Sequence, residues 1–190
     1  MPKVILWDAD GVTLERQKEY FSQRFARGYR APLEDVTNFF KANYRRCQAG
    51  ELDLKQELAA VLPTWGWQAS VDEFLAYWFS TDMPDQAVLA KVAEFRAQGI
   101  ACYLATDQEK YRAANIRETL DFGKLFDRCF FSYELGVSKE EPEFFTKILA
   151  ELKVQPNEVV FWDDDMKNVE AAKAVGIDAR FYASIEDIRI

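Results

Sequence analysis

The stretch that decides the fold is Val4-Ile5-Leu6-Trp7-Asp8-Ala9-Asp10-Gly11, where a short apolar run ends in two carboxylates and a glycine. The apolar run predicts a buried strand. In open α/β sheets the ligand crevice lies just beyond the carboxyl ends of the strands. Side chains two residues apart on an extended segment project to the same side, so Asp8 and Asp10 can address one bound group. The two carboxylates repel each other unless a cation, a proton or a substrate lies between them. We therefore expect Asp8 and Asp10 to belong to a functional site.

The composition is that of an acidic protein with enough apolar residues for a large core. The chain has 190 residues, of which 49% are hydrophobic and 15% aromatic, and its formal net charge is −8. This length fits one domain with an insertion, or two small domains. The acidic balance disfavours a nucleic-acid or anionic-membrane partner, and no apolar run could span a membrane. The acidic balance does not exclude an anionic substrate, because a local cation can invert the field of a site. The sequence leaves the oligomeric state open.

The use of cysteine and histidine restricts the compartment and the chemistry. Cys47, Cys102 and Cys129 lie far apart in apolar surroundings, which predicts reduced core residues of a cytoplasmic protein. No secretory signal is visible at the N-terminus. The sequence contains no histidine, which excludes Ser-His-Asp and Cys-His nucleophile systems and a histidine-ligated zinc site. Carboxylate, lysine and hydroxyl chemistry remains, together with a hard metal ion.

Residues 15–83 show only helical patterns. Apolar stripes at helical spacing predict one helix near 21–29, a single helix over 36–47, and a third that stops at Pro63. The stretch Ser70-Val71-Asp72-Glu73 is a capping box that opens a fourth helix. We therefore expect an all-helical cap inserted over residues 15–83, directly above the acidic pair.

From residue 85 onward, helical patterns alternate with short apolar runs. Helices are expected near 88–95, 110–120, 144–152 and 167–175, and strands at 100–105, 128–131, 158–162 and 178–182. Strands that alternate with helices imply right-handed crossovers and a parallel sheet. The sequence thus predicts an α/β protein whose Rossmann-like, three-layer core around a parallel sheet is formed by residues 1–14 and 84–190.

Polar residues follow several of the predicted strands, and parallel strands place their carboxyl ends at one edge of a sheet. Besides the first acidic pair, the residues expected at this edge are Thr106, Asp107, Lys139, Asp163, Asp164 and Asp165. This set of carboxylates, an ammonium and a hydroxyl suits phosphoryl transfer. Carboxylates hold Mg²⁺, the lysine and hydroxyl neutralise phosphoryl oxygens, and an aspartate can act as the nucleophile.

The motifs resemble those of the haloacid dehalogenase-like (HAD) hydrolase superfamily, in its helical-cap phosphatase group (C1, subfamily I). Asp8-Ala9-Asp10-Gly11 matches the first motif, and Thr106 at a strand end matches the second. Gly136 to Lys139 matches the third. Asp163-Asp164, followed by Asn168 to Ala172, matches the fourth. Each motif alone is weak, but all four in this order span nearly the whole chain.

The resemblance implies a Mg²⁺-dependent phosphatase that hydrolyses a small phosphorylated metabolite through an aspartyl-phosphate. Asp8 would be the nucleophile. Asp10 would protonate the leaving oxygen and then activate water. The metal ligands would be Asp8, Asp10 through its backbone carbonyl, Asp163 and Asp164. The phosphate-binding residues would be Thr106, Asp107 and Lys139.

Two positions depart from the family pattern, and one of them, Asp107, adds a negative charge near the anionic substrate unless it turns away. Asp107 occupies a place where the family often has asparagine, and Glu140 one where it often has proline. We regard both departures as tolerable, with low activity or an unusual substrate as the alternative.

Other functions remain open. The same superfamily contains 2-haloacid dehalogenases, although the second aspartate of the first motif, Asp10, argues against that activity. It also contains phosphosugar mutases. A catalytically silent binding relative is a further alternative. A signalling receiver domain would place the acidic pair before the phosphoacceptor and would lack the large helical insertion.

The predicted cap is locally basic in an otherwise acidic chain. Two interpretations are open for its arginines: a solvated basic face, or a site for a second anionic group of the substrate. The arginines are Arg24, Arg27, Arg30, Arg45 and Arg46.

Overall fold

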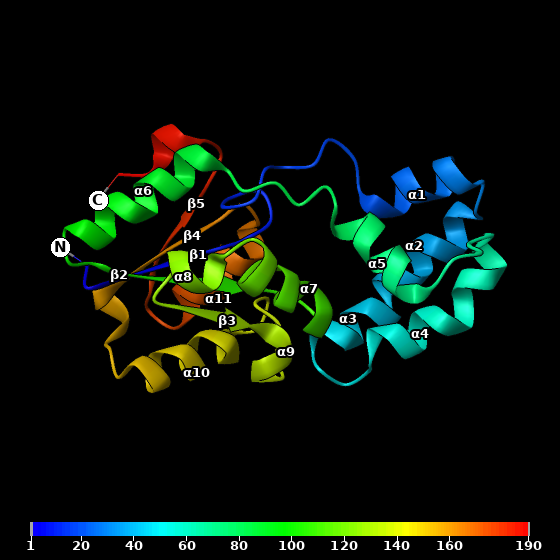
Figure 1. Cartoon of the computed structure of the whole chain (residues 1–190). Coiled ribbons are helices and arrows are strands. Elements are labelled where there is room, and N and C mark those ends of the chain that lie inside the picture. Colours follow the sequence, from blue (N-terminus) through cyan, green and yellow to red (C-terminus); the bar gives the residue numbers. More distant parts are fainter. Residues whose placement is uncertain (1, 190) are drawn as a thin grey trace.

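The computed structural model describes residues 2–189, in which five strands form one parallel sheet (Figure 1). The strand order is β3-β2-β1-β4-β5, and every pairing is parallel. The strands are β1 (Val4–Trp7), β2 (Ala101–Thr106), β3 (Arg128–Phe131), β4 (Val159–Asp163) and β5 (Asp178–Phe181). All four residues of the central strand β1 are buried. The predicted α/β fold with a parallel sheet is confirmed.

Helices cover both faces of the sheet. Ile5 and Trp7 of β1 pack into one apolar cluster with helix α6, whereas Val4 and Leu6 pack into another with α10 and α11. This alternation follows from the two-residue period of a strand. The core helices are α6 (Gln86–Ala97), α7 (Lys110–Ala114), α8 (Phe122–Leu125), α9 (Ser132–Leu135), α10 (Pro142–Leu152) and α11 (Met166–Ala174). The core therefore has three layers.

Five further helices, here called the helical insert, lie together beside the sheet (Figure 1). They are α1 (Phe21–Tyr29), α2 (Leu33–Lys41), α3 (Asn43–Gln48), α4 (Leu54–Val61) and α5 (Val71–Phe79). They enclose an apolar cluster of their own, rich in aromatic rings. An isolated bridge between Leu14 and Pro84 brings the outgoing and returning connections side by side. The predicted domain boundaries at 14/15 and 83/84 remain a prediction.

Helix ends show where local signals were sufficient and where they were not. The capping box at Ser70 and Glu73 is present at the start of α5. The single helix expected over 36–47 is wrong, because the chain kinks at Ala42 and α3 then brings Tyr44 against Trp78, with ring centroids 5.1 Å apart. The helix expected to stop at Pro63 ends at Val61 instead. Proline is tolerated in the first turn of the short 3₁₀ helix Leu62–Trp65 that follows.

The helix expected over 110–120 also has a different form. Helix α7 ends at Ala114 and continues as a π-helical turn, Asn115–Thr119. The four-residue helices α8 and α9 are too short to show a periodic pattern and were not predicted. Short 3₁₀ turns, Pro156–Glu158 and Ile185–Asp187, complete the structure. Among the helices of residues 2–189, none is long and apolar enough to cross a membrane.

The three cysteines are free and buried. Burial raises the pKa of the Cys47 and Cys129 thiols to about 12 and that of Cys102 to about 11. Their thiolates are therefore scarce at neutral pH, as expected for core residues. The cellular compartment remains a prediction.

Candidate active site

The backbone after β1 is fixed tightly enough to aim both carboxylates of the first motif. The Asp8 amide donates to Trp162 O at 3.0 Å, and Thr13 Oγ1 donates to Asp8 O at 2.7 Å. Gly11 has φ +75°, and a Cβ there would lie 2.2 Å from Asp164 Oδ2. Only glycine fits both the turn and this close approach. The sharp turn thus depends on the glycine of the motif.

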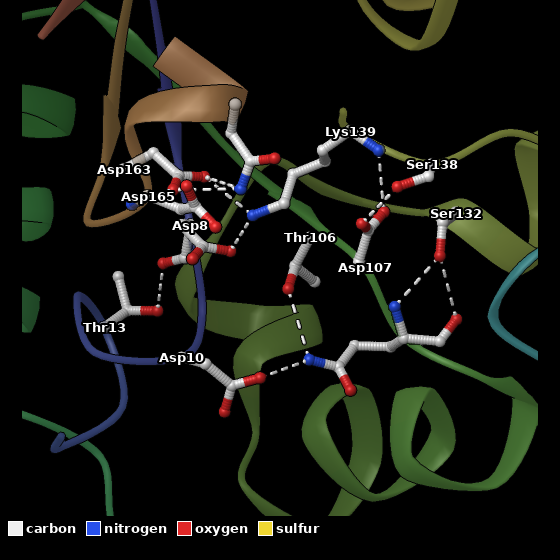
Figure 2. Close-up of polar contacts among 12 residues, drawn as sticks. Asp8, Asp10, Thr13, Thr106, Asp107, Ser132, Ser138, Lys139, Asp163 and Asp165 are labelled. Atoms are coloured by element: carbon white, nitrogen blue, oxygen red, sulfur yellow. Dashed lines mark hydrogen bonds and ion pairs between the residues drawn. The ribbon is translucent and has the colours of Figure 1, made fainter. Parts of the chain in front are cut away.

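One group of charges, here called the lysine cluster, consists of Asp8, Lys139 and Asp163 (Figure 2). Lys139 Nζ donates to Asp8 Oδ1 and, at 2.7 Å, to Asp163 Oδ2. Lys139, Asp8 and Asp163 are all almost fully buried. Asn168 Nδ2 donates to both oxygens of Asp163, at 3.1 and 3.2 Å, so the carboxylate is held from both sides. The strand ends β1 and β4 and the loop before α10 therefore converge as predicted.

Burial and charge oppose each other in the lysine cluster. Burial, followed by the charge of Asp163, raises the pKa of Asp8 well above its usual value, although Lys139 acts in the opposite direction. Burial alone would lower the pKa of Lys139, but the two carboxylates raise it, so the ammonium keeps its proton. One ammonium facing two carboxylates leaves the cluster with an excess of negative charge.

Asp164 adds a third carboxylate at the same place. One oxygen from each of Asp8, Asp163 and Asp164 can be chosen so that all three lie within 4.8 Å of one another. Burial and the charge of Asp163 raise the pKa of Asp164. Arg16 Nη2 donates to Asp164 Oδ2 at 2.9 Å from an exposed position. A set of clustered carboxylate oxygens is the donor type that Mg²⁺ prefers.

A second group of charges, here called the arginine cluster, consists of Asp10, Arg112 and Asp82. Arg112 donates from Nη1 and Nη2 to the two oxygens of Asp10, at 2.7 and 2.6 Å. From Nε and Nη2 it also donates to the two oxygens of Asp82, at 3.0 and 2.8 Å. Gln108 Nε2 donates to Asp10 at 2.8 Å. A planar guanidinium can form two such bidentate pairs at once, whereas an ammonium cannot.

The arginine cluster gives Asp10 an environment opposite to that of Asp8. Desolvation by the surrounding protein would by itself raise the pKa of Asp10. The charge and hydrogen bonds of Arg112 outweigh desolvation, so the pKa of Asp10 is lowered. The Asp10 side chain is also 52% exposed, whereas Asp8 is buried. Asp10 is therefore held as a carboxylate facing the solvent.

Sequence reasoning missed Arg112, Asp82 and Gln108. The available signal was weak: Gln108 follows Thr106 by two residues, and Arg112 lies in the first turns of the next helix, α7. Gln108 and Arg112 therefore both lie close to the sheet edge at which the other polar groups were predicted. Asp82 follows the helical insert, and nothing local in the sequence ties it to Asp10.

The second-motif residues occupy two different positions. Thr106 is buried, and its Oγ1 accepts a hydrogen bond from Gln108 Nε2 at 3.2 Å. The Asp107 carboxylate accepts from Ser138 Oγ at 2.6 Å and from the Lys139 amide at 2.8 Å, as Figure 2 shows. It faces the loop that carries Lys139 and braces it. The expected phosphate-binding roles of Thr106, Asp107 and Lys139 remain predictions.

A cleft of about 940 Å³ lies between the core and the helical insert. Asp10, Asp164 and Arg112 line its core side. Residues of α1, α2, α3 and α5 line the opposite side, among them Phe21, Arg24, Phe40, Tyr44 and Trp78. A volume of this size suits a small organic ligand.

Comparison with known proteins decides the family. The sequence description of the haloacid dehalogenase-like hydrolases matches residues 2–176, which is most of the chain. This protein belongs to the haloacid dehalogenase-like hydrolases. The family predicted from the four motifs is thus confirmed, and with it the prediction of a hydrolase.

Relatives with assigned activities include phosphatases. This HAD-like hydrolase is 27% identical to a phosphorylated carbohydrates phosphatase of Thermotoga maritima, over 98% of its own length and 87% of the relative's. It is 33% identical to a sesquiterpene phosphatase of Aspergillus oryzae, but over only 50% of this chain and 48% of that one.

Solved structures share the fold. A HAD family enzyme of Bacteroides thetaiotaomicron superposes with a TM-score of 0.80 at 19% identity, over 95% of this chain and 93% of that one. The same enzyme has been solved as a magnesium complex, with a TM-score of 0.79 at 20% identity, over 95% and 93% of the two chains. At this identity the likeness establishes the architecture of the HAD-like hydrolase and not its substrate.

Proposed function

We propose that this HAD-like hydrolase is a Mg²⁺-dependent phosphatase that hydrolyses a small phosphomonoester through an aspartyl-phosphate on Asp8. The observation that supports it most is the lysine cluster, in which a buried aspartate at a strand end lies between a lysine and further carboxylates. The phosphatases among its relatives support the same reaction class.

The residues present fit a magnesium ion. Asp8, Asp163 and Asp164 gather three carboxylates near a single ammonium. Burial, followed by repulsion from Asp163, raises the pKa of both Asp8 and Asp164. A divalent cation would relieve that repulsion. These side chains and the backbone carbonyl of Asp10 would hold the ion. When bound, it would supply charge neutralisation for the phosphoryl oxygens.

In the first step an Asp8 oxygen attacks phosphorus, and the bond from phosphorus to the ester oxygen breaks. Lys139 and Thr106 neutralise the phosphoryl oxygens, and Asp10 delivers a proton to the departing oxygen. In the second step Asp10 takes a proton from water. The resulting hydroxide attacks phosphorus, and Asp8 is released with inorganic phosphate as the product.

The arginine cluster favours one of the two roles of Asp10. Arg112 holds Asp10 ionised, which prepares it to accept a proton from water in the second step. Delivery of a proton in the first step requires Asp10 to gain that proton and loosen its contact with Arg112. Esters with acidic leaving groups need less help in the first step, and we expect them to react faster.

The experiment is hydrolysis of 4-nitrophenyl phosphate by the purified protein with Mg²⁺ or with EDTA. We expect activity that depends on Mg²⁺ and falls by about 10⁴-fold or more in Asp8→Asn, because an amide is a poor nucleophile. Asp72→Asn is the matched control, since Asp72 is exposed on the helical insert, away from the cleft, and pairs with Lys55. We expect this control to retain wild-type activity.

Three results would contradict the proposal. One is robust hydrolysis by Asp8→Asn. Another is activity indifferent to Mg²⁺. The third is inactivity on a broad panel of phosphate esters, which would favour a catalytically silent relative. A requirement for a sugar bisphosphate with transfer of phosphate would indicate a mutase instead.

A further inference from the structure

One arginine of the helical insert is left without a partner at the wall of the cleft. Arg24 lies on α1 and lines the cleft that Asp10 and Asp164 line from the core side. Its Nε and Nη2 atoms are shielded from solvent and have no hydrogen-bond partner among the described residues. Within residues 2–189 its side chain forms no ion pair. A buried donor on a charged group that lacks an acceptor is costly, and such groups point to a missing ligand.

The other arginines that make the insert basic are already engaged or lie elsewhere. Arg27 donates to both oxygens of Glu19 at 2.6 Å, Arg46 pairs with Glu51, and Arg45 pairs with Glu140. Arg30 is exposed at the end of α1. None of these four lines the cleft. The structure thus separates the two interpretations of the basic segment: a solvated face for four arginines, and a cleft position for Arg24.

Aromatic rings hold the Arg24 side chain in place. Its guanidinium carbon lies 5.3 Å from the centroid of Phe21 and 5.5 Å from that of Tyr77. These rings support the cation but offer no strong hydrogen-bond acceptor. An anion that reached Nε and Nη2 would supply the acceptors that these two donors lack among the described residues.

Aromatic rings form part of the cleft wall on the side of the helical insert, among polar and charged residues that include Arg16, Lys18 and Glu19. Phe21 stacks on Trp78 with centroids 5.1 Å apart, and Phe40 meets Trp78 edge-on at 5.0 Å. A path lined by these rings suits the carbon skeleton of an organic ester. The same cleft is lined by Asp10 and Asp164 at the strand ends and by Arg24.

We propose that Arg24 binds a second anionic group of the substrate, a carboxylate or a second phosphate, at the end of the molecule opposite the ester that is cleaved. The inference rests on the proposed function, because it takes the cleaved phosphate to lie at the lysine cluster. It makes Arg24 a specificity-determining residue and the substrate an organic phosphomonoester with two anionic ends.

The test compares matched ligands that differ in the second anion. Glucose 6-phosphate is compared with 6-phosphogluconate, and fructose 6-phosphate with fructose 1,6-bisphosphate. Binding is measured by calorimetry with Mg²⁺ present, in the Asp8→Asn protein, so that no turnover interferes. We expect the second anion to tighten binding by about tenfold or more, the usual worth of a hydrogen bond to a charged group. The pair with the larger gain identifies a carboxylate or a phosphate.

Three further substitutions, each made in the Asp8→Asn protein, show which residue is responsible for the gain in affinity. Arg24→Gln should reduce it to less than about threefold, and Arg24→Lys should keep part of it, because an ammonium retains the charge but not the planar fork. Arg27→Gln is the matched control on the same helix and should keep the full gain. Equal gains in Arg24→Gln and Arg27→Gln, or no gain for either pair while Arg24 is intact, would overturn the inference.

Turnover of the same four esters by the wild-type protein reports separately on the proposed function. A gain in binding that depends on Arg24, without Mg²⁺-dependent turnover, would preserve the binding site and reject the phosphatase. Turnover without any effect of Arg24 would preserve the phosphatase and reject the binding site.

Discussion

The lysine cluster and the arginine cluster have the same formal composition but opposite effects on the first motif. Each consists of one cation and two carboxylates, and each contains one aspartate of the pair Asp8 and Asp10. In the lysine cluster the pKa of Asp8 is raised, whereas in the arginine cluster that of Asp10 is lowered. A single residue, Ala9, therefore separates an aspartate whose charged form is disfavoured from one whose charged form is stabilised.

The difference arises from burial and from the geometry of the cation. Lys139 is a point charge shared between two buried carboxylates, so burial and the repulsion from Asp163 dominate at Asp8. Arg112 offers a planar fork to each of its partners, and the Asp10 side chain is half exposed. The first arrangement leaves negative charge for a metal ion. In the second arrangement Arg112 donates to both oxygens of each carboxylate, and Asp10 stays ionised and able to accept a proton.

The largest expected effect is a loss of turnover, and its dependence on the leaving group distinguishes Asp10 from Asp8. Asp10→Asn should lower turnover of an alkyl phosphate by about 10²–10⁴-fold, the usual contribution of a general acid or base. Its effect on 4-nitrophenyl phosphate should be smaller, because that leaving group needs no proton. Asp8→Asn should abolish the reaction of both esters alike. Steady-state kinetics with the two esters checks this, and equal losses for both esters in Asp10→Asn would contradict proton delivery by Asp10.

The next effect compares the two cations as sources of stability. Lys139→Met leaves Asp8 and Asp163 buried without a cation, and should lower the free energy of unfolding by about 3–5 kcal/mol. Arg112→Met should lower it less, because Asp82 is buried but Asp10 can turn toward water. Arg27→Met, which breaks an exposed pair, should change it least of the three. Urea unfolding at pH 7 with EDTA measures all three, and equal losses for the two buried cations would contradict the comparison.

The smallest effect concerns pH and the sign of each aspartate's contribution. The folded pKa of Asp8 is raised, so its contribution to stability falls as pH rises from about 4, the unfolded value, through the folded pKa. The folded pKa of Asp10 is lowered, so its contribution is present above about pH 4 and is lost as pH falls through the folded pKa.

In metal-free protein at pH 7, Asp8→Asn should therefore raise the free energy of unfolding by about 0.5–2 kcal/mol, as relief of strained active-site groups does. Asp10→Asn should lower it. The gain in Asp8→Asn should shrink as the pH is lowered toward 4, whereas the loss in Asp10→Asn should shrink only as the pH falls below about 4. Urea titrations at several pH values provide the measurement, and shifts of the same sign for both variants would refute the assigned environments.

The sequence determined the parallel α/β core, the family and the lysine cluster. These features depend on local patterns: apolar runs that end in polar residues, and helix signals between them, which together fix the sheet edge where Asp8, Lys139 and Asp163 meet. Once the strands are parallel, their ends meet regardless of details elsewhere. Prediction succeeded because each motif residue adjoins a strand end or lies in the loop that closes on it.

Only the tertiary structure decided the arginine cluster and the position of Arg24. Asp10, Asp82 and Arg112 belong to three separate segments, and no local pattern links them, because the packing of the helical insert against the core sets their distances. Likewise, five arginines look alike along the chain. Burial and the presence or absence of an acidic partner distinguish Arg24 from Arg27, and both arise only when distant segments pack together.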